Sequence, residues 1–192
     1  MNTPATLSKK RNDLSRNLIL DASYALLKTA SVSELTVRAV AQQAGMSERT
    51  VFRYFPSRDA LLDGVTAQLL AEMALPAPPQ SMQALLDAPC TLYGAFEARA
   101  ELTRALLHTD LVSRMRSLQG ILRRQAVGAL LDAAAPASGE QERRIATANI
   151  CFHLSASSWH YCRFQFGLSL DDAIHCADTA VRQALAAIGV RA

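Results

Sequence analysis

Residues 35–61 read LTVRAVAQQAGMSERTVFRYFPSRDAL, and this stretch decides the fold of the N-terminal third of the chain. Thr36 and Ser47 are of the residue types that cap helix N-termini, and Gly45 tolerates the left-handed backbone that often ends a helix. The pattern therefore predicts two short helices that begin at these two caps, are joined by a tight turn at the glycine, and end near Phe55.

The spacing inside this pair of helices is typical of a helix-turn-helix. Ala41 is small where the second helix crosses the first, Gly45 follows at the turn, and Val51 is the apolar anchor six residues later. With Val37 and Val40 buried between the helices, the outer face of the second helix is left to solvent or to a partner. Arg and Thr at the start of such a helix can reach base edges in the major groove of DNA. For this spacing alone, an ordinary helical hairpin with a solvated charged face is the alternative.

The residues at the end of the second helix extend the pattern. Residues 35–61 resemble the TetR (tetracycline repressor-like) family of bacterial transcription regulators. In that family an aromatic residue, two further residues and Phe are followed by a small polar, a basic and an acidic residue and then Leu. The matching positions here are Phe52, Phe55, Ser57, Arg58, Asp59 and Leu61. The resemblance extends back to about Arg16, and beyond Gly64 it concerns the architecture only.

The resemblance implies roles for single residues. Thr36, Tyr54 and Arg58 are expected to contact phosphates, while Arg49 and Thr50 are expected to read base edges. The complete set of residues predicted to bind DNA is Thr36, Arg38, Ser47, Arg49, Thr50, Phe52, Arg53, Tyr54 and Arg58.

Three of these positions depart from the family pattern. Phe52 stands where Tyr is usual, so a phenolic phosphate contact is replaced by packing or by a thymine-methyl contact. Arg49 stands where a small residue is common, which predicts a guanine contact that many relatives lack. Arg58 replaces the more usual Lys and keeps the charge with a different geometry. The operator sequence therefore cannot be transferred from the family.

The positive charge of the chain lies in the same region. Through Gly64 the sequence has nine Lys and Arg against six Asp and Glu, so this first third carries the whole net charge of +3. A cationic segment on an otherwise neutral chain favours a module that binds a polyanion. Residues 1–11, with Lys9, Lys10 and Arg11, are predicted to form a flexible basic arm, either entering a minor groove or acting as a solubilising tail.

Apolar residues recur at helical intervals along the rest of the chain, and no strand-like alternation of useful length is present. A helix over about 57–75 ends at the Pro-rich residues 76–79. Further helical patterns cover 81–87, 91–108, 111–135, 140–166 and 170–188. The predicted fold class is all-α, with an N-terminal three-helix helix-turn-helix DNA-binding domain over 12–64 and a C-terminal helical ligand-binding and dimerisation domain over 65–192.

Two helical stretches near the C-terminus predict a surface for a second copy of the chain. Apolar residues between 145 and 168 fall on opposite sides of one helix, so both sides need cover. The last helix carries a stripe of alanines, which allows helices to approach closely. We therefore expect a four-helix homodimer interface, with intramolecular packing as the alternative. The expected interface residues are Leu154, Ser157, Tyr161, Ala173, Ala177, Ala180, Ala184 and Ala187.

The helical body is also expected to enclose a small, largely apolar ligand. The candidate lining residues come from 81–135 and from the inward side of 145–166, and for each of them ordinary core packing is the alternative. They are Phe96, Leu102, Leu106, His108, Met115, Leu118, Leu122, Phe152 and Trp159.

The four cysteines are Cys90, Cys151, Cys162 and Cys176, and they form neither a CxxC pair nor a metal-ligand spacing. No metal and no cofactor is therefore expected. Buried thiols in a reduced, cytoplasmic protein are favoured, with a redox-sensing pair as the alternative. The sequence shows no export signal and no apolar run long enough to span a membrane.

These patterns predict a ligand-responsive DNA-binding transcriptional regulator. We expect it to be a repressor that binds a palindromic operator as a homodimer and is released by the small ligand. A helical enzyme is a second hypothesis, although no GxGxxG, GxSxG, P-loop or HExxH pattern is present. A helical protein-interaction module that never contacts DNA is a third.

Overall fold

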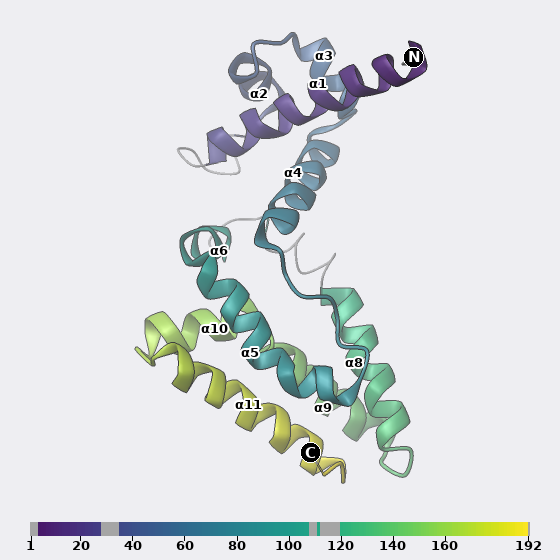
Figure 1. Ribbon diagram of the computed structural model, residues 1–192, viewed down its shortest axis with the longest axis vertical. Coiled ribbons are helices and arrows are strands. Elements are labelled where there is room, and N and C mark those ends of the chain that lie inside the picture. Colours follow the sequence, from purple (N-terminus) through teal and green to yellow (C-terminus); the bar gives the residue numbers. More distant parts are fainter. Residues whose placement is uncertain (1–3, 28–34, 108–110, 112–119, 192) are drawn as a thin grey trace. The chain divides into compact units, whose positions relative to one another are not determined.

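A computed structural model describes residues 4–27, 35–107, 111 and 120–191. Every regular element in these ranges is a helix (Figure 1), so the all-α prediction is confirmed for the described part of the chain. The chain divides into two compact units, the first reaching Glu72 and also including Leu111, and the second beginning at Met73. The division lies near the end of the helix over 58–73, whereas the boundary predicted from the sequence, after Gly64, lies within that helix. No helix in the described ranges is long and apolar enough to cross a bilayer.

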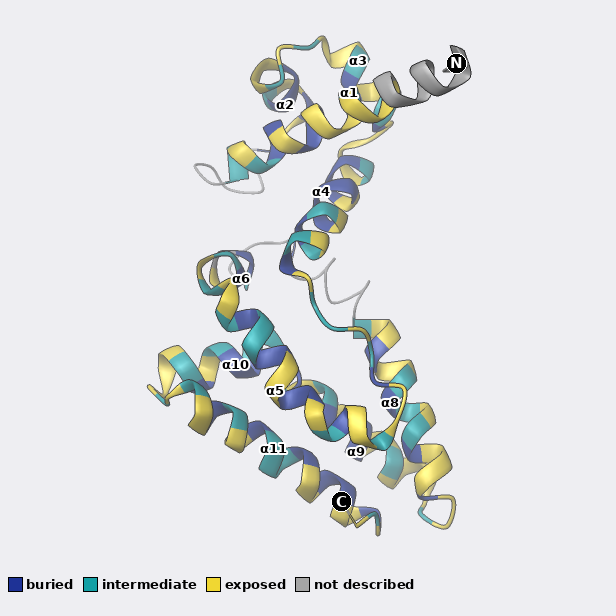
Figure 2. Cartoon of the chain, viewed as in Figure 1, coloured by how far each residue is buried: buried dark blue, intermediate teal, exposed yellow. Residues whose placement is uncertain are grey.

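The first unit consists of four helices around a small apolar core (Figure 2). Its core side chains come from every helix and include Ile19, Leu20, Val40, Val51, Phe55, Leu61, Leu62 and Val65. The four helices are α1 (Pro4–Leu27), α2 (Val37–Gln43), α3 (Glu48–Tyr54) and α4 (Arg58–Met73).

The first helix is longer than the sequence predicted. α1 begins at Pro4, so the backbone of residues 4–11, expected to be a flexible basic arm, is helical. That prediction is wrong for these residues. Proline is favoured at the first position of a helix, and the Ala, Leu, Lys and Arg residues that follow it are good helix formers. Residues 1–3, the other part of the expected arm, lie outside the described ranges.

The second unit is a bundle in which α11 lies against α9 and α5, and α8 lies against α9 (Figure 1). Its buried side chains include Leu85, Tyr93, Phe96, Leu131, Ile150, Trp159, Val181 and Leu185. Its helices are α5 (Met82–Ala98), α6 (Ala100–Leu107), α8 (Ile121–Ala134), α9 (Glu140–His153), α10 (Ala156–His160), the π-helix η3 (Tyr161–Gln165) and α11 (Leu170–Ala187).

Three helix boundaries in this unit differ from the prediction, and one of them is the division of the expected helix 91–108 at Arg99, between α5 and α6. α5 runs straight through Pro89, where a break was expected, because Leu85, Pro89 and Leu92 are buried on one face and this packing outweighs one missing hydrogen bond. The expected helix 140–166 is divided at Leu154, since the Ser155 side chain accepts a hydrogen bond from the backbone N–H of Ser158 (3.2 Å) and starts a new helix. The two apolar seams predicted along that helix therefore do not continue through it.

The alanine stripe of α11 faces the interior of its own unit. Ala173, Ala177 and Ala184 are buried there, and so is Leu154 at the end of α9. The prediction that these four residues lie in an interface between two copies is wrong, because α11 uses its small residues to approach α9 and α5 closely. Ser157 and Ala180 are half-buried, while Tyr161 and Ala187 are exposed.

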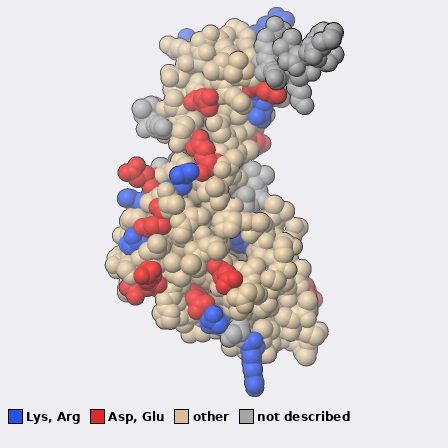
Figure 3. Space-filling model, viewed as in Figure 1, with Lys and Arg blue, Asp and Glu red and all other residues tan. Residues whose placement is uncertain are grey.

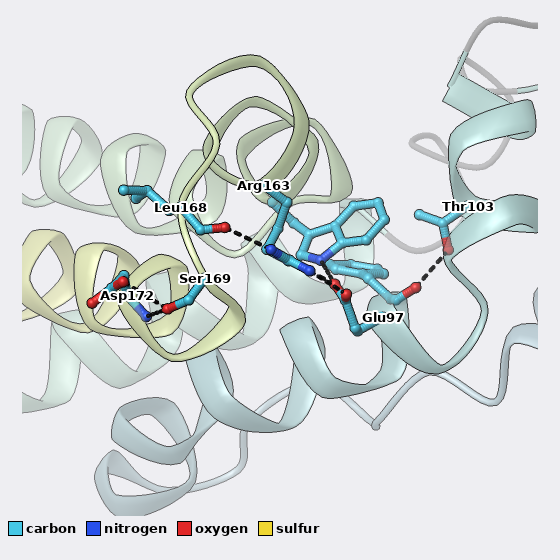
Figure 4. Close-up of polar contacts among 8 residues, drawn as sticks. Glu97, Thr103, Arg163, Leu168, Ser169 and Asp172 are labelled. Atoms are coloured by element: carbon cyan, nitrogen blue, oxygen red, sulfur yellow. Dashed lines mark hydrogen bonds and ion pairs between the residues drawn. The ribbon is translucent and has the colours of Figure 1, made fainter.

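A polar cluster joins the helices of the second unit around the single tryptophan (Figure 4). The Glu97 carboxylate of α5 accepts hydrogen bonds from Trp159 Nε1 (2.9 Å) and from Arg163 Nε (3.0 Å) and Nη2 (2.6 Å). Arg163 Nη1 also donates to the carbonyl of Leu168 (2.6 Å), just before α11. The cluster therefore connects α5, α10, η3 and the start of α11.

The Arg163 guanidinium controls the charge state of Glu97. Its hydrogen bonds hold the pKa of the Glu97 carboxyl below its ordinary value, and partial burial opposes this only in part. The Glu97 side chain is 26% exposed and the Arg163 side chain is 22% exposed, so water screens the ion pair only in part.

We expect Glu97→Gln to destabilise the second unit by about 1–2 kcal/mol at neutral pH, through the loss of charge-assisted hydrogen bonds. Because the folded pKa of Glu97 is lowered, its contribution is complete above the pKa of an unfolded glutamate, about 4.3, and is lost as the pH falls through the folded value. Urea unfolding followed by Trp159 fluorescence should therefore show a smaller difference between wild type and variant at about pH 3.5 than at about pH 7. Glu101→Gln on the exposed side of α6 is the control, and an equal loss in both variants would contradict this role of Glu97.

Candidate nucleic-acid interface

The side chains predicted from sequence as helix caps occupy those positions in the structure. The Thr36 hydroxyl accepts a hydrogen bond from the backbone N–H of Ala39 (3.1 Å) and starts α2. The Ser47 hydroxyl accepts one from the backbone N–H of Thr50 (3.2 Å) and starts α3, and its oxygen lies 2.9 Å from the Thr50 hydroxyl oxygen. Both predicted starts are confirmed. Each hydroxyl accepts in its cap and still carries a proton that it can donate.

The turn between α2 and α3 depends on Gly45. Its φ is +64°, in the left-handed region that a residue with a Cβ enters at a cost. Its N–H donates to the carbonyl of Gln42 (3.2 Å), and the N–H of Met46 donates to the carbonyl of Ala41 (2.9 Å). This pair of bonds is a Schellman motif, which closes the C-terminus of α2 and sets the direction of the chain into α3.

The inner face of the pair of helices is apolar, as predicted. Val37, Val40 and Ala41 of α2 are buried, and Val51 of α3 has no exposed surface at all. Phe55, which follows α3, is buried as well and lies under the Arg16 guanidinium, whose Cζ is 5.0 Å from the ring centroid. α3 is therefore fixed on one side by Val51 and at its end by Phe55.

The outer face of α3 is accessible. Glu48, Arg49 and Arg53 are exposed, and Phe52 retains 46% of its surface. Arg49 lies in the first turn of the helix, which is the part that reaches base edges when such a helix enters a major groove. An exposed phenylalanine beside it offers an apolar contact of the kind that a thymine methyl group accepts.

Arg53 and Tyr54 form one unit at the end of α3. The Arg53 Cζ lies 5.0 Å from the Tyr54 ring centroid, and its Nη2 donates to the Tyr54 hydroxyl (3.2 Å). This cation–π contact restrains a long side chain next to a phenolic hydroxyl. Two donors of this kind, side by side, suit a phosphate oxygen.

Arg58 has a role that the sequence analysis missed. Its Nε donates to the carbonyl of Leu35 (3.1 Å), the residue immediately before the Thr36 cap. Arg58 therefore connects the first residue of α4 to the entry of α2, in addition to the phosphate contact predicted for it. A bond between positions 23 residues apart leaves no periodic signal in the sequence. The family pattern, which has a basic residue at this position, pointed to Arg58 as important but not to this contact.

The charged side chains of the second unit are distributed differently from those on α2 and α3. On the face seen in Figure 3, its acidic and basic side chains are interspersed and do not gather into a patch of one sign. The exposed arginines of α2 and α3, Arg38, Arg49 and Arg53, lie in the first unit. These exposed arginines of the helix-turn-helix therefore suit a polyanion.

The residues predicted to line a ligand site differ in how far they are exposed. Phe96, Leu106 and Trp159 are buried, and Phe96 and Trp159 pack with ring centroids 6.0 Å apart. Leu102 is half-buried. Leu122 and Phe152 are 54% and 59% exposed, so their predicted place in an enclosed site is wrong for the single chain. The other three predicted residues, His108, Met115 and Leu118, lie outside the described ranges.

Residues 19–65 match the model of the bacterial regulatory proteins of the tetR family. Two helices capped by Thr36 and Ser47, joined at Gly45 and packed through Val51, are the structural form of this match. Residues 19–65 therefore resemble the N-terminal domain of the tetR-family regulatory proteins. A match to regulatory proteins favours the regulator hypothesis over the helical-enzyme hypothesis.

Two curated relatives are similar over the same part of the chain. The tetracycline repressor protein class D of Escherichia coli is 33% identical over 76 residues, which cover 38% of this chain and 35% of that protein. The nucleoid occlusion factor SlmA of Marinomonas sp. (strain MWYL1) is 36% identical over 59 residues, covering 31% of this chain and 29% of the relative. The matched residues thus span about a third of the length of these relatives.

One solved structure is similar over more of the chain. The crystal structure of a TetR transcriptional regulator from Rhodococcus sp. RHA1 superposes with a TM-score of 0.49 at 19% identity, covering 92% of this chain and 98% of that one. A similarity at this level carries no argument about the second unit.

Gly64 of α4 holds the end of α3 in place through the absence of a side chain. A Cβ at this position would lie 2.6 Å from Cε1 of the buried Phe55 ring and 3.2 Å from Cδ2 of Leu20. Neither neighbour has free space, because Phe55 and Leu20 are both buried.

We expect Gly64→Ala to destabilise the first unit by about 1–3 kcal/mol, since the added methyl group overpacks this core. Gly94→Ala in α5 is the matched control, because nothing lies within 4 Å of a Cβ there and alanine is the better helix former. Thermal unfolding followed by circular dichroism should show a lower midpoint for Gly64→Ala and an equal or higher one for Gly94→Ala. Equal stability of Gly64→Ala and wild type would contradict the close packing at Phe55.

Proposed function

We propose that this protein is a DNA-binding transcriptional regulator that uses α3 as its recognition helix. The observation that carries the proposal is the two-sided character of this helix, with Val51 fully buried on one side and Arg49, Phe52 and Arg53 accessible on the other. A helix anchored in this way can enter a major groove without disturbing its own core. The family match over residues 19–65 supports the same function.

The proposal assigns separate roles to the exposed side chains. Arg49 and Thr50, in the first turn of α3, read base edges, with Phe52 as an apolar contact. Thr36, Ser47, Arg38, Arg53 and Tyr54 contact phosphates and fix the position of the helix on the duplex. Arg58 contributes charge to the same surface and also holds the start of α2 through Leu35.

The predicted repressor activity belongs to the same proposal. A protein bound to a palindromic operator excludes other proteins from that DNA, and its release by a small, largely apolar ligand restores access. The apolar interior of the second unit, with Phe96, Leu106 and Trp159, supports a ligand of this character. Coupling of this kind is reciprocal, so operator and ligand weaken each other's binding by the same factor. Since it acts on chromosomal DNA, we place the protein in the cytoplasm.

Selection of bound duplexes from a random pool tests the DNA-binding function directly. For the selected operator, Arg49→Ala should lower discrimination at one base position by about 1–3 kcal/mol, because a bidentate base contact is lost. Arg53→Ala should weaken binding to all duplexes alike and reduce the slope of log affinity against log salt by about one. Arg53 is a cleaner test of a phosphate contact than Arg58, whose removal also loosens α2.

Arg124→Ala, an exposed arginine of α8 in the second unit, is the matched control and should leave binding unchanged. A pool from which no duplex is enriched would overturn the proposed function. If Arg49→Ala lowered the affinity for every duplex equally, only the base-reading role of Arg49 would be contradicted.

We further propose a homodimer that uses an exposed apolar face of α9. Ile145 and Phe152 are 54% and 59% exposed and lie seven residues apart, on the same side of the helix. Exposed apolar side chains that line up on one face of a helix favour cover by another surface. A second copy supplies that cover by symmetry, and the two recognition helices of a dimer suit half-sites roughly 34–36 Å apart.

Ile145→Glu should shift the protein from dimer to monomer in sedimentation velocity experiments, because a charge placed in an apolar interface loses its hydration. Leu122→Glu on α8 is the matched control, since Leu122 is exposed to the same extent, 54%, on a different helix. A dimer that persists in the Ile145→Glu and Phe152→Glu double variant would contradict this interface. A dimer lost only in Leu122→Glu would place the interface on α8.

A further inference from the structure

Two of the four cysteines contact each other in the second unit. Cys162 lies in η3 and is buried, whereas Cys176 lies in α11 and is exposed. The two thiols are within hydrogen-bonding reach of each other, and the Tyr93 hydroxyl lies close to both. We propose that Cys162 and Cys176 form a reversible intramolecular disulfide when the protein meets a hydroperoxide. This inference does not depend on DNA binding.

The chain brings these two thiols together by a tight reversal between η3 and α11. Gly167 has a φ of +80°, and the N–H of Leu168 donates to the carbonyl of Cys162 itself (2.9 Å). Ser169 then caps α11 by accepting a hydrogen bond from the N–H of Asp172 (3.1 Å) (Figure 4). The reversal thus places η3 against α11, and the side chains of Cys162 and Cys176 meet between these two elements.

The remaining cysteines have other surroundings. Cys90 is exposed on α5, and Cys151 is half-buried on α9, where burial raises the pKa of its thiol and the positive charge of Arg123 opposes that rise. All four cysteines lie within the described residues, and Cys162 and Cys176 are the pair whose thiols meet. The prediction that the thiols are buried is therefore wrong for Cys90 and Cys176, because exposed helix faces carry them.

The surroundings of the two thiols set the order of the reaction. Burial and, to a smaller extent, the neighbouring Cys176 thiol together raise the pKa of Cys162 to about 11, so Cys162 is protonated at neutral pH. Cys176 is the thiol that an oxidant in solution can reach. Cys176 therefore reacts first and Cys162 resolves the product.

The reaction balances with one hydroperoxide for each disulfide. The Cys176 thiolate attacks the O–O bond, the alcohol leaves, and a sulfenic acid remains on Cys176. The Cys162 sulfur then attacks this sulfenic sulfur, the S–S bond forms, and the departing hydroxide takes the Cys162 proton as water. Two thiols lose two electrons and two hydrogens, and the peroxide is reduced to an alcohol and water.

The disulfide would act on the polar cluster around Trp159. Arg163, the residue after Cys162, holds both Glu97 and the carbonyl of Leu168. A covalent bond from Cys162 to α11 constrains the π-helix that carries Arg163, and π-helical turns are frequent at functional sites. Trp159 is the single tryptophan and lies three residues before Cys162, so its fluorescence reports the change.

The experiment uses the full-length, fully reduced protein with hydrogen peroxide and, in parallel, cumene hydroperoxide. Intact-mass spectrometry should show the loss of two hydrogens from the monomer, reversed by dithiothreitol, together with a change in Trp159 emission. Trypsin cleaves after Arg144, Arg163 and Arg182, so a non-reducing digest should link peptide 145–163 to peptide 164–182. Peptide 145–163 also contains Cys151, so the digest is repeated with Cys151→Ser, which should retain the link.

Cys176→Ser, a change at an exposed position, should abolish the disulfide. Cys162→Ala should leave a sulfenic acid on Cys176 that dimedone traps, and Cys90→Ser is the matched control that should behave as wild type. The proposal is overturned if the bond involves Cys90 or Cys151 or joins two copies. It is also overturned if peroxide converts wild-type Cys176 to sulfinic acid without a disulfide, or if no thiol is oxidised.

Discussion

The burial of Val51 is the constraint on which the outer face of α3 depends. A helix of seven residues has too few internal hydrogen bonds to be stable alone, so its position must come from tertiary packing. Val51 supplies that packing on the side facing α2, and Phe55 supplies it where the helix ends. The exposed residues of α3 can then be charged or aromatic without a loss of fold, since none of them is needed in the core. The separation of the two faces allows a binding surface on so short an element.

In the second unit, short elements are held in place by polar contacts. Its chain changes direction at Leu154, and the segment after this point consists of one short helix, a π-helix and a turn. Such short elements offer few internal bonds, and Glu97 of the longer α5 compensates by binding Trp159 and Arg163 together. Tyr93 contributes in the same way, with its hydroxyl donating to the carbonyl of His153 (3.0 Å) at the end of α9. Irregular backbone is thus held by side chains that a regular helix provides.

The sequence predicted the features that depend on local chemistry. The caps at Thr36 and Ser47, the turn at Gly45 and the anchor at Val51 each follow from the properties of one residue and its spacing to the next. The predictions failed where two packing partners could satisfy the same pattern. Alanines at helical spacing indicate a close approach but do not say whether the other helix belongs to the same chain, and α11 uses its alanines inside its own unit. The contact between Arg58 and Leu35 joins distant positions and leaves no trace in any periodicity.

For the same reason, the exposure of apolar side chains in the structure indicates a partner surface better than apolar periodicity in the sequence does. A period of three to four residues marks every helix face that is covered, whether by the core or by another molecule. Only the structure separates the two, because it shows which apolar faces the chain itself has already covered. In α9 the residues Ala146 and Ile150 are buried while Ile145 and Phe152 remain exposed, so one helix carries both kinds of face. The sequence was right that a helix in this region is apolar on two sides, and the structure shows that only one of these sides in α9 is covered by the chain itself.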